Sequence, residues 1–152
     1  MKKALGLLLV AIVVLAVCGV VAWSLLLQPA PAPNVGADLP PEKTVGETFE
    51  MTVVVSNPHA EPIAVHRVDI DRTLVRGFNV LKVVPAPTDD RLLPIEKCRS
   101  WRFDREVAPG NELTITFAMQ PIEAGRFAGK VEVLNKALDG TSADAAITIH
   151  KK

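Results

Sequence analysis

The chain has 152 residues, a formal net charge of zero and 49% hydrophobic residues. Much of that hydrophobicity lies in the first 27 residues, and the remainder has the length and mixed composition of one domain with its own core. Setting Lys2 and Lys3 aside leaves 15 of the 17 lysines and arginines against 17 aspartates and glutamates. This balance offers no general attraction to nucleic acid or to acidic lipid, so nucleic-acid binding is not expected.

The N-terminal run from Ala4 to Leu27 carries no charged side chain over 24 residues. As a helix it would be about 36 Å long, enough to cross a hydrocarbon core of about 30 Å with some tilt. The next basic residue after Lys3 is Lys43, so the positive-inside rule places residues 1–3 in the cytoplasm as a short stub. The sequence predicts a single-pass cell-membrane protein, anchored through residues 4–27, whose remaining chain is extracytoplasmic.

Three fates of this hydrophobic run remain open: a retained signal-anchor, a cleaved signal peptide and a lipoprotein signal. The run is longer than the usual apolar region of a signal peptide, and Pro33 follows the small-residue site at residues 30–32, which favours retention. Residues 15–18, LAVC, resemble a bacterial lipobox that would lipidate Cys18, although Val17 is larger than the usual small residue. All three fates place the domain outside the cytoplasm.

Residues 28–41, QPAPAPNVGADLPP, contain five prolines, which favour extended polyproline conformations. At about 3.1 Å per residue, such a segment could hold a domain up to about 40 Å from the bilayer. The segment is therefore predicted to be a stalk, and the folded domain to occupy residues 42–152.

Most of this domain alternates apolar and polar side chains with a period of two, the pattern of half-buried β-strands. Turns rich in proline or glycine separate the alternating stretches. The clearest predicted strands are 48–56, 63–71, 78–84, 98–107, 113–119, 127–133 and 145–149. With no convincing amphipathic helix among them, they predict an all-β fold: a seven- or eight-stranded antiparallel immunoglobulin-like sandwich preceded by one transmembrane helix.

Three stretches carry a resemblance to a known group of domains: FEMTVVVSNPHAEPI, APGNELTITFAMQP and AGRFAGKVEV. Together they resemble extracytoplasmic immunoglobulin-like domains of prokaryotic surface proteins, over residues 45–150. Phe127 stands where such domains often place a corner tyrosine, so the usual hydroxyl-to-backbone bond would be missing. The stretch VSNPHAEPIAVHRVDID also resembles the start of a water-stress (late-embryogenesis-abundant) domain, another sandwich. Neither resemblance implies catalytic residues.

Clustered acidic and histidine side chains are the first candidates for a metal site. Asp69 and Asp71 project from one side of a predicted strand and, with Asp89 and Asp90, could supply oxygen ligands to Ca²⁺. A calcium loop would also need a third close ligand, a turn glycine and a distal glutamate, so a solvated strand face is the simpler interpretation. The histidines, which are His59, His66 and His150, have no spacing typical of zinc or copper sites. No metal or other cofactor is expected.

Cys98 is the one cysteine in the predicted domain, since Cys18 lies in the hydrophobic run. An exposed thiol in an oxidising compartment could form an intermolecular disulfide, and Lys97 and Arg99 would lower its pKa. Burial as a small hydrophobe is the favoured interpretation. Cys98 is therefore a candidate reactive thiol only if it is exposed.

Basic side chains suggest a surface for a protein partner. The apolar positions of residues 63–71 change parity around His66 and Arg67, which predicts a bulge or an edge strand there. Residues 91–105 hold five basic residues interleaved with two aromatic ones, and Arg99 and Arg102 lie on opposite faces of the predicted strand. The candidate partner-binding residues are His66, Arg67, Arg99 and Arg102.

Catalysis finds no support in the sequence, because the GxSxG elbow and glycine-rich phosphate loops are absent. No catalytic residue, enzyme activity or small-molecule substrate is expected. The leading hypothesis is a membrane-tethered module that binds another protein, as an accessory subunit of a membrane or envelope assembly. The alternatives are a carbohydrate- or metal-binding surface domain using Trp101 and the four aspartates, or a lipoprotein anchored through Cys18.

Overall fold

The computed structural model describes residues 32–152 of the chain. The predicted membrane segment Ala4–Leu27 and the start of the predicted stalk lie outside these residues. Within the described range, no helix combines the length and the apolar character needed to span a bilayer.

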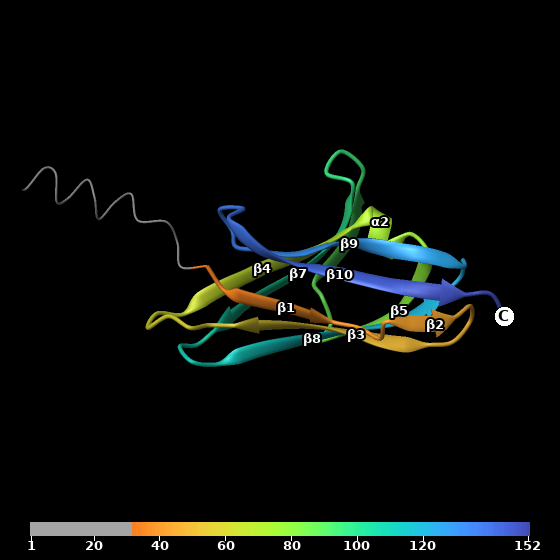
Figure 1. Ribbon diagram of the computed structural model, residues 1–152. Coiled ribbons are helices and arrows are strands. Elements are labelled where there is room, and N and C mark those ends of the chain that lie inside the picture. The colour runs from red at the N-terminus through yellow and green to blue at the C-terminus, as the bar shows by residue number, and fades with distance from the viewer. Residues whose placement is uncertain (1–31) are drawn as a thin grey trace, which may run out of the picture. The chain divides into compact units, whose positions relative to one another are not determined.

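Ten β-strands and one short helix make up the described part of the chain (Figure 1). The helix α2 covers Arg72–Val75, and its Leu74 and Val75 are buried. The strands are β1 (Asn34–Asp38), β2 (Glu42–Thr44), β3 (Phe49–Ser56), β4 (Ile63–Asp71), β5 (Phe78–Val84), β6 (Asp89–Leu93), β7 (Cys98–Val107), β8 (Glu112–Pro121), β9 (Gly125–Leu134) and β10 (Gly140–His150).

The strands form two sheets that pack face to face as a sandwich (Figure 1). One sheet has four strands in the order β1-β3-β8-β5, and the other has six in the order β2-β10-β9-β4-β7-β6. The predicted all-β sandwich is confirmed, although it contains more strands than the predicted seven or eight. It is also not purely antiparallel, because β2 pairs in parallel with β10.

The N-terminal strands β1 and β2 correct the predicted stalk. Residues Asn34–Asp38 pair antiparallel with β3, and Val35 and Ala37 pack against the core. The prolines at positions 40 and 41 follow, and the chain then joins the other sheet through β2. A stalk prediction that extends to residue 41 is therefore wrong, because a short alternating segment gains main-chain hydrogen bonds by pairing with a neighbouring strand.

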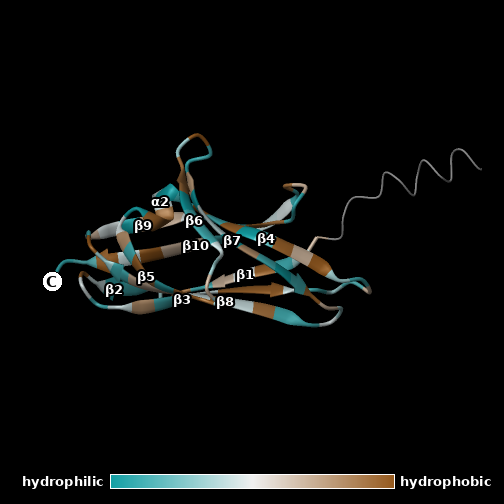
Figure 2. Ribbon diagram, turned by 180° about the vertical axis from the view of Figure 1, so that it is seen from behind, coloured by the Kyte–Doolittle hydropathy of each residue, from teal (hydrophilic) through white to brown (hydrophobic). Residues whose placement is uncertain are grey.

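The core lies between the sheets and is filled by alternate residues of each strand. Along β3, the residues at odd positions from Phe49 to Val55 are buried, as predicted from the period of two. Figure 2 shows the same alternation as brown and teal bands along the ribbons. Phe78 packs edge-on against both Phe49 and Phe127, with ring centroids 5.6 Å and 4.9 Å apart.

A β-bulge interrupts the pairing of β4 with β7, but β4 is not an edge strand. Val65 pairs with Arg105 and Arg67 pairs with Arg102, so β7 has two residues opposite His66. The predicted bulge near His66 and Arg67 is confirmed. The predicted edge is wrong, because β7 and β9 flank β4 on its two sides. The edges of the six-stranded sheet are instead β2 and β6, and β6 lies between residues 84 and 98, where no strand was predicted.

Candidate functional site

A groove on the outer face of the six-stranded sheet is the candidate site. Its floor comes from adjacent strands, because Asp69 of β4 pairs with Ser100 of β7 on one side and Glu132 of β9 on the other. Residues paired in this way point to the same face of a sheet. The groove has a cavity volume of about 410 Å³, within the usual range of about 300–1,000 Å³ for ligand sites.

Two hairpin loops form the walls of the groove. The β6–β7 loop, residues 94–97, supplies Glu96, and the β9–β10 loop supplies Leu138. Figure 1 shows the green β6–β7 hairpin projecting beyond the sheet. Lys97 closes this loop with a φ of 57°, and its carbonyl oxygen accepts a hydrogen bond from the Arg72 N–H at 2.8 Å. The wall that carries Glu96 is therefore anchored at its base to α2.

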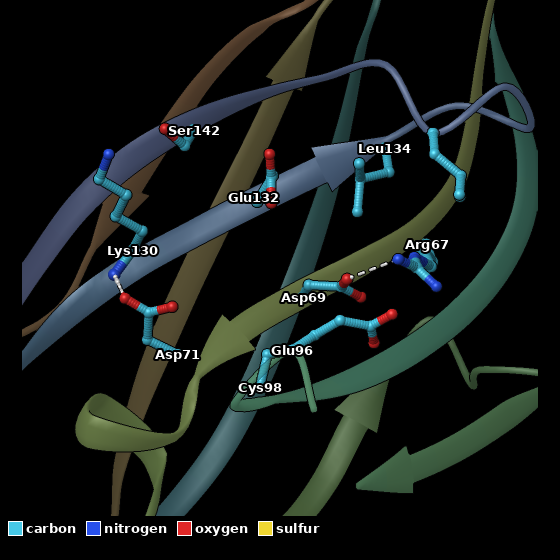
Figure 3. A pocket seen from close by; sticks show the side chains of 10 residues that line it. Arg67, Asp69, Asp71, Glu96, Cys98, Lys130, Glu132, Leu134 and Ser142 are labelled. Atoms are coloured by element: carbon cyan, nitrogen blue, oxygen red, sulfur yellow. Dashed lines mark hydrogen bonds and ion pairs between the residues drawn. The ribbon is translucent and has the colours of Figure 1, made fainter. Parts of the chain in front are cut away.

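Asp69 is the buried acidic residue at the floor of the groove (Figure 3). Its side chain is only 7% exposed, and its Oδ2 lies 3.1 Å from Arg67 Nη2. Its Oδ1 has no hydrogen-bond partner among the described residues. Burial raises the pKa of Asp69, and the nearby Ser100 hydroxyl and the Arg67 guanidinium only partly offset that effect. The groove thus contains a carboxylate whose hydrogen-bonding capacity is incompletely used.

Cys98 lies beside Asp69 and is 5% exposed. Burial, followed by the Asp69 carboxylate, raises the pKa of the Cys98 thiol to about 11. The thiol is therefore protonated at neutral pH, which is the opposite of the activated thiolate that a reactive cysteine needs. The structure agrees with the interpretation of Cys98 as a buried hydrophobe and not as a reactive thiol.

Asp71 shares the outer face with Asp69, as the strand pattern predicted, and it holds β4 against β9. Its Oδ2 accepts a hydrogen bond from the backbone N–H of Lys130 at 2.8 Å. The neighbouring Gly129 has room for no side chain, since a Cβ there would lie 2.6 Å from the Cβ of Asp71. The carboxylate of Asp71 therefore accepts a backbone hydrogen bond from β9 at the end of the groove.

The other two aspartates do not join Asp69 and Asp71. Asp89 forms an ion pair with Arg91, and Asp90 accepts two hydrogen bonds from Arg99, at 2.9 Å and 2.7 Å. In residues 32–152, no group of three histidine, cysteine, aspartate or glutamate side chains is placed to hold a metal ion. The predicted set of four aspartates is therefore divided: Asp69, Asp89 and Asp90 form separate ion pairs with arginines, and Asp71 accepts a hydrogen bond from the backbone.

The predicted partner-binding residues are spread over two strands and do not form one patch. Arg67 and Arg102 face each other across β4 and β7. Arg99 lies over the ring of Trp101, with its Cζ 5.0 Å from the ring centroid, and is held there by Asp90. His66 Nδ1 is 2.5 Å from Asp104 Oδ1. Of the four, only Arg67 lines the groove.

Trp101 is fully buried and packs edge-on against Phe117, with ring centroids 4.9 Å apart. A sugar ring can stack only on an exposed aromatic face. The hypothesis of a carbohydrate site built on Trp101 is therefore wrong, because the alternation that places Trp101 on this strand points it into the core.

Sequence reasoning missed Glu96 and Glu132, the two exposed carboxylates of the groove. The signal for Glu132 is its position between Val131 and Val133, which puts it on the outer face of its strand. What the sequence does not reveal is that β9 lies next to β4, more than 50 residues earlier in the chain. The groove depends on that long-range pairing.

Comparisons with known proteins support the fold. No family model matches the chain, and a search of curated proteins finds no match. Among solved structures, the chain is similar to a cohesin module from a family 33 glycoside hydrolase of Clostridium perfringens, with a TM-score of 0.51 and 9% identity. That match covers 81% of this chain and 100% of the module. At this identity the likeness shows the fold alone, an immunoglobulin-like β-sandwich.

The chain is also similar to a transglutaminase from red sea bream, with a TM-score of 0.48 and 16% identity. The match covers 82% of this chain but 16% of the transglutaminase. The chain thus corresponds in length to a small part of that protein.

Proposed function

We propose that this protein is a membrane-tethered, extracytoplasmic immunoglobulin-like module that binds another protein, as an accessory subunit of a membrane or envelope assembly. The observation that carries the proposal is the groove on the outer face of a single sandwich, with walls made by two hairpin loops. Loops held by a rigid sandwich are a common place for binding residues.

Exposed apolar side chains at the tips of these loops support a protein partner. Ile95 is 95% exposed in the β6–β7 loop, and Leu138 is 57% exposed in the β9–β10 loop. Large apolar side chains next to a polar groove are typical of surfaces that contact other proteins. Both residues lie where a partner that covered the groove would bury them.

Two properties of the chain support the tether. The uncharged run Ala4–Leu27 is long enough to span a bilayer, and only the short segment 28–31 separates it from the described domain. The first described residues lie at one end of the sandwich and the C-terminus at the other (Figure 1). A domain tethered through its N-terminus would therefore leave its C-terminal end free.

Crosslinking in native membranes tests the proposal. The full chain is crosslinked, purified in mild detergent and identified with its partners by mass spectrometry, and membrane association is checked by carbonate extraction. We expect the chain in the carbonate-resistant fraction with a reproducible partner. Recovery of the protein alone would contradict the proposed function.

A Cys18→Ser variant identifies the type of anchor. A retained helix predicts unchanged membrane association for this variant and an intact mass that includes residue 1. Release from the membrane would assign the lipoprotein alternative, in which lipid is attached to Cys18.

A further inference from the structure

We infer that the groove formed by β4, β7, β9 and their hairpin loops binds a cationic side chain, arginine or lysine, from an extended basic segment of a partner protein. This inference rests on the proposed function, because it specifies the chemistry of the partner. It is carried by the charge of the groove, by its unsatisfied buried carboxylate and by its apolar wall.

The charge of the groove favours a cation. Four carboxylates line it, against the two cationic side chains of Arg67 and Lys130. Arg67 is already paired with Asp69 at 3.1 Å, which leaves the exposed carboxylates of Glu96 and Glu132 on opposite sides of the floor (Figure 3). A concave surface lined mainly by one sign of charge concentrates the field and attracts the opposite charge.

One oxygen of the buried carboxylate at the floor of the groove has no hydrogen-bond partner among the described residues. Asp69 is more than nine-tenths buried, yet its Oδ1 has no partner within residues 32–152. An unsatisfied buried acceptor is costly, and natural structures usually supply a donor from protein, water or ligand. An ammonium or guanidinium group bound at the floor would donate to this free oxygen, since Arg67 pairs with the other one.

The shape of the groove suits a long aliphatic side chain that ends in a charge. Leu134 and Leu138 line it beside the carboxylates, so the methylene stem of lysine or arginine can lie on an apolar surface. A bare metal ion would gain nothing from contact with these apolar side chains. The described residues also offer no three-ligand set to hold one. An anion would meet the exposed carboxylates of Glu96 and Glu132.

Fluorescence anisotropy with a labelled hexa-arginine peptide tests the inference on the full chain in non-ionic detergent. The matched peptide is hexa-citrulline, which has nearly the same shape without the charge. We expect saturable binding of hexa-arginine and at least about tenfold weaker binding of hexa-citrulline. Equal binding of the two peptides, or no saturable binding of hexa-arginine, would overturn the inference.

Paired variants locate the binding on the protein. Glu96→Gln with Glu132→Gln removes the two exposed carboxylates of the groove, and Glu112→Gln with Glu123→Gln removes two exposed carboxylates elsewhere. We expect the first pair to weaken binding of hexa-arginine about tenfold or more and the second pair to change it less than about twofold. Equal losses would show general attraction to acidic protein and would overturn the inference.

Site-specific photocrosslinking separates this inference from the proposed function. A benzoylphenylalanine probe replaces Leu138 at the groove or Leu81 of β5 on the other sheet, both more than half exposed. If the probe at position 138 captures a partner, and the Glu96→Gln and Glu132→Gln pair abolishes that capture, the result supports both the proposed function and the groove as the binding site. Capture from position 81 alone overturns the groove as the binding site but keeps the proposed function. Capture from neither contradicts both.

Discussion

The ring of Phe127 lies directly over the Cα of Gly77, so that a Cβ added at Gly77 would be 2.2 Å from Phe127 Cζ. The ring cannot easily move, because it is buried and packs edge-on against Phe78. We expect Gly77→Ala to lower the free energy of unfolding by about 1–3 kcal/mol through overpacking. Urea unfolding of the full chain in detergent, followed by tryptophan fluorescence, measures this change.

Gly36→Ala is the control for this prediction. Gly36 lies in β1, and a methyl group added there would have no other atom within 4 Å, so its substitution should be neutral within about 0.5 kcal/mol. Similar urea midpoints for the two variants would mean that the Phe127 ring gives way, contrary to the rigid packing described above.

Asn57 connects the β3–β4 loop to the last residue of β7, at the end of the sandwich where β1 begins. Its Nδ2 donates to the carbonyl oxygens of Glu61 at 2.8 Å and Val107 at 2.9 Å, and its Oδ1 accepts from the His59 N–H at 2.9 Å. The side chain is buried. We expect Asn57→Ala to lower the free energy of unfolding by about 2–4 kcal/mol, because it leaves buried carbonyl groups without donors.

A His59→Ala variant tests whether the side chain of Asn57, and not the loop in general, supplies this stability. The His59 ring contacts only the carbonyl oxygen of Ala32 in the hydrogen-bond network of the described residues, at 2.8 Å. A change within about 0.5 kcal/mol is expected for it. Thermal unfolding of both variants, monitored by circular dichroism, makes the comparison, and equal losses would disprove the assignment.

Asp69 should make stability depend on pH in a defined direction. Because burial raises its pKa in the folded state, the native protein binds this proton more tightly than the unfolded chain does, and Asp69 lowers stability as the pH rises through that pKa. Asp69→Asn removes the titration and keeps an oxygen for Arg67. The stability of the variant relative to wild type should therefore increase between pH 4 and pH 7 in urea titrations.

The difference between variant and wild type isolates Asp69 from other carboxyl groups. The pKa of Glu47 is lowered by its hydrogen bonds to Lys43 and Thr44, which gives the opposite dependence, but Glu47 is present in both proteins. A difference in stability that stays constant with pH would show that Asp69 is not held in an unfavourable charged state.

The Cys98 thiol should be nearly inert in the folded protein. With its pKa raised to about 11 from the ordinary 9.0, the thiolate fraction at pH 8 falls by about a hundredfold, and burial restricts access further. In a Cys18→Ser background, alkylation by iodoacetamide at pH 8 should be at least about a hundred times slower than in urea. Equal rates of modification in the two conditions would show an accessible thiol.

The longer strands, which include the edge strand β5, were predictable because the alternation of apolar and polar side chains along them indicates which face is buried. In β4, β5 and β7 the predicted bounds agree with the observed ones, since each strand has apolar residues on the face that packs into the core. The short edge strands β1, β2 and β6 were missed. Edge strands bury little and are stabilised by main-chain pairing with a neighbour, so prolines and charges conceal them in the sequence.

The groove was only partly predictable. The spacing of Asp69 and Asp71 on one strand predicts that they share a face. Glu96 and Glu132 reach the same groove because β4 lies between β7 and β9, and no local pattern specifies that order. For Trp101, the alternating pattern of its strand correctly predicts burial, whereas the carbohydrate-binding hypothesis needed an exposed ring.

The switch of the N-terminal chain between sheets has a mechanical consequence. β1 pairs antiparallel with β3 and β2 pairs in parallel with β10, while the first described residues and the C-terminus lie at opposite ends of the sandwich (Figure 1). A pull between those two ends runs along the strands, so it loads the β2–β10 hydrogen bonds together in shear instead of opening them one at a time. The β2–β10 pairing should therefore resist a pull between the two ends of the described domain better than a pair of strands whose hydrogen bonds open in sequence.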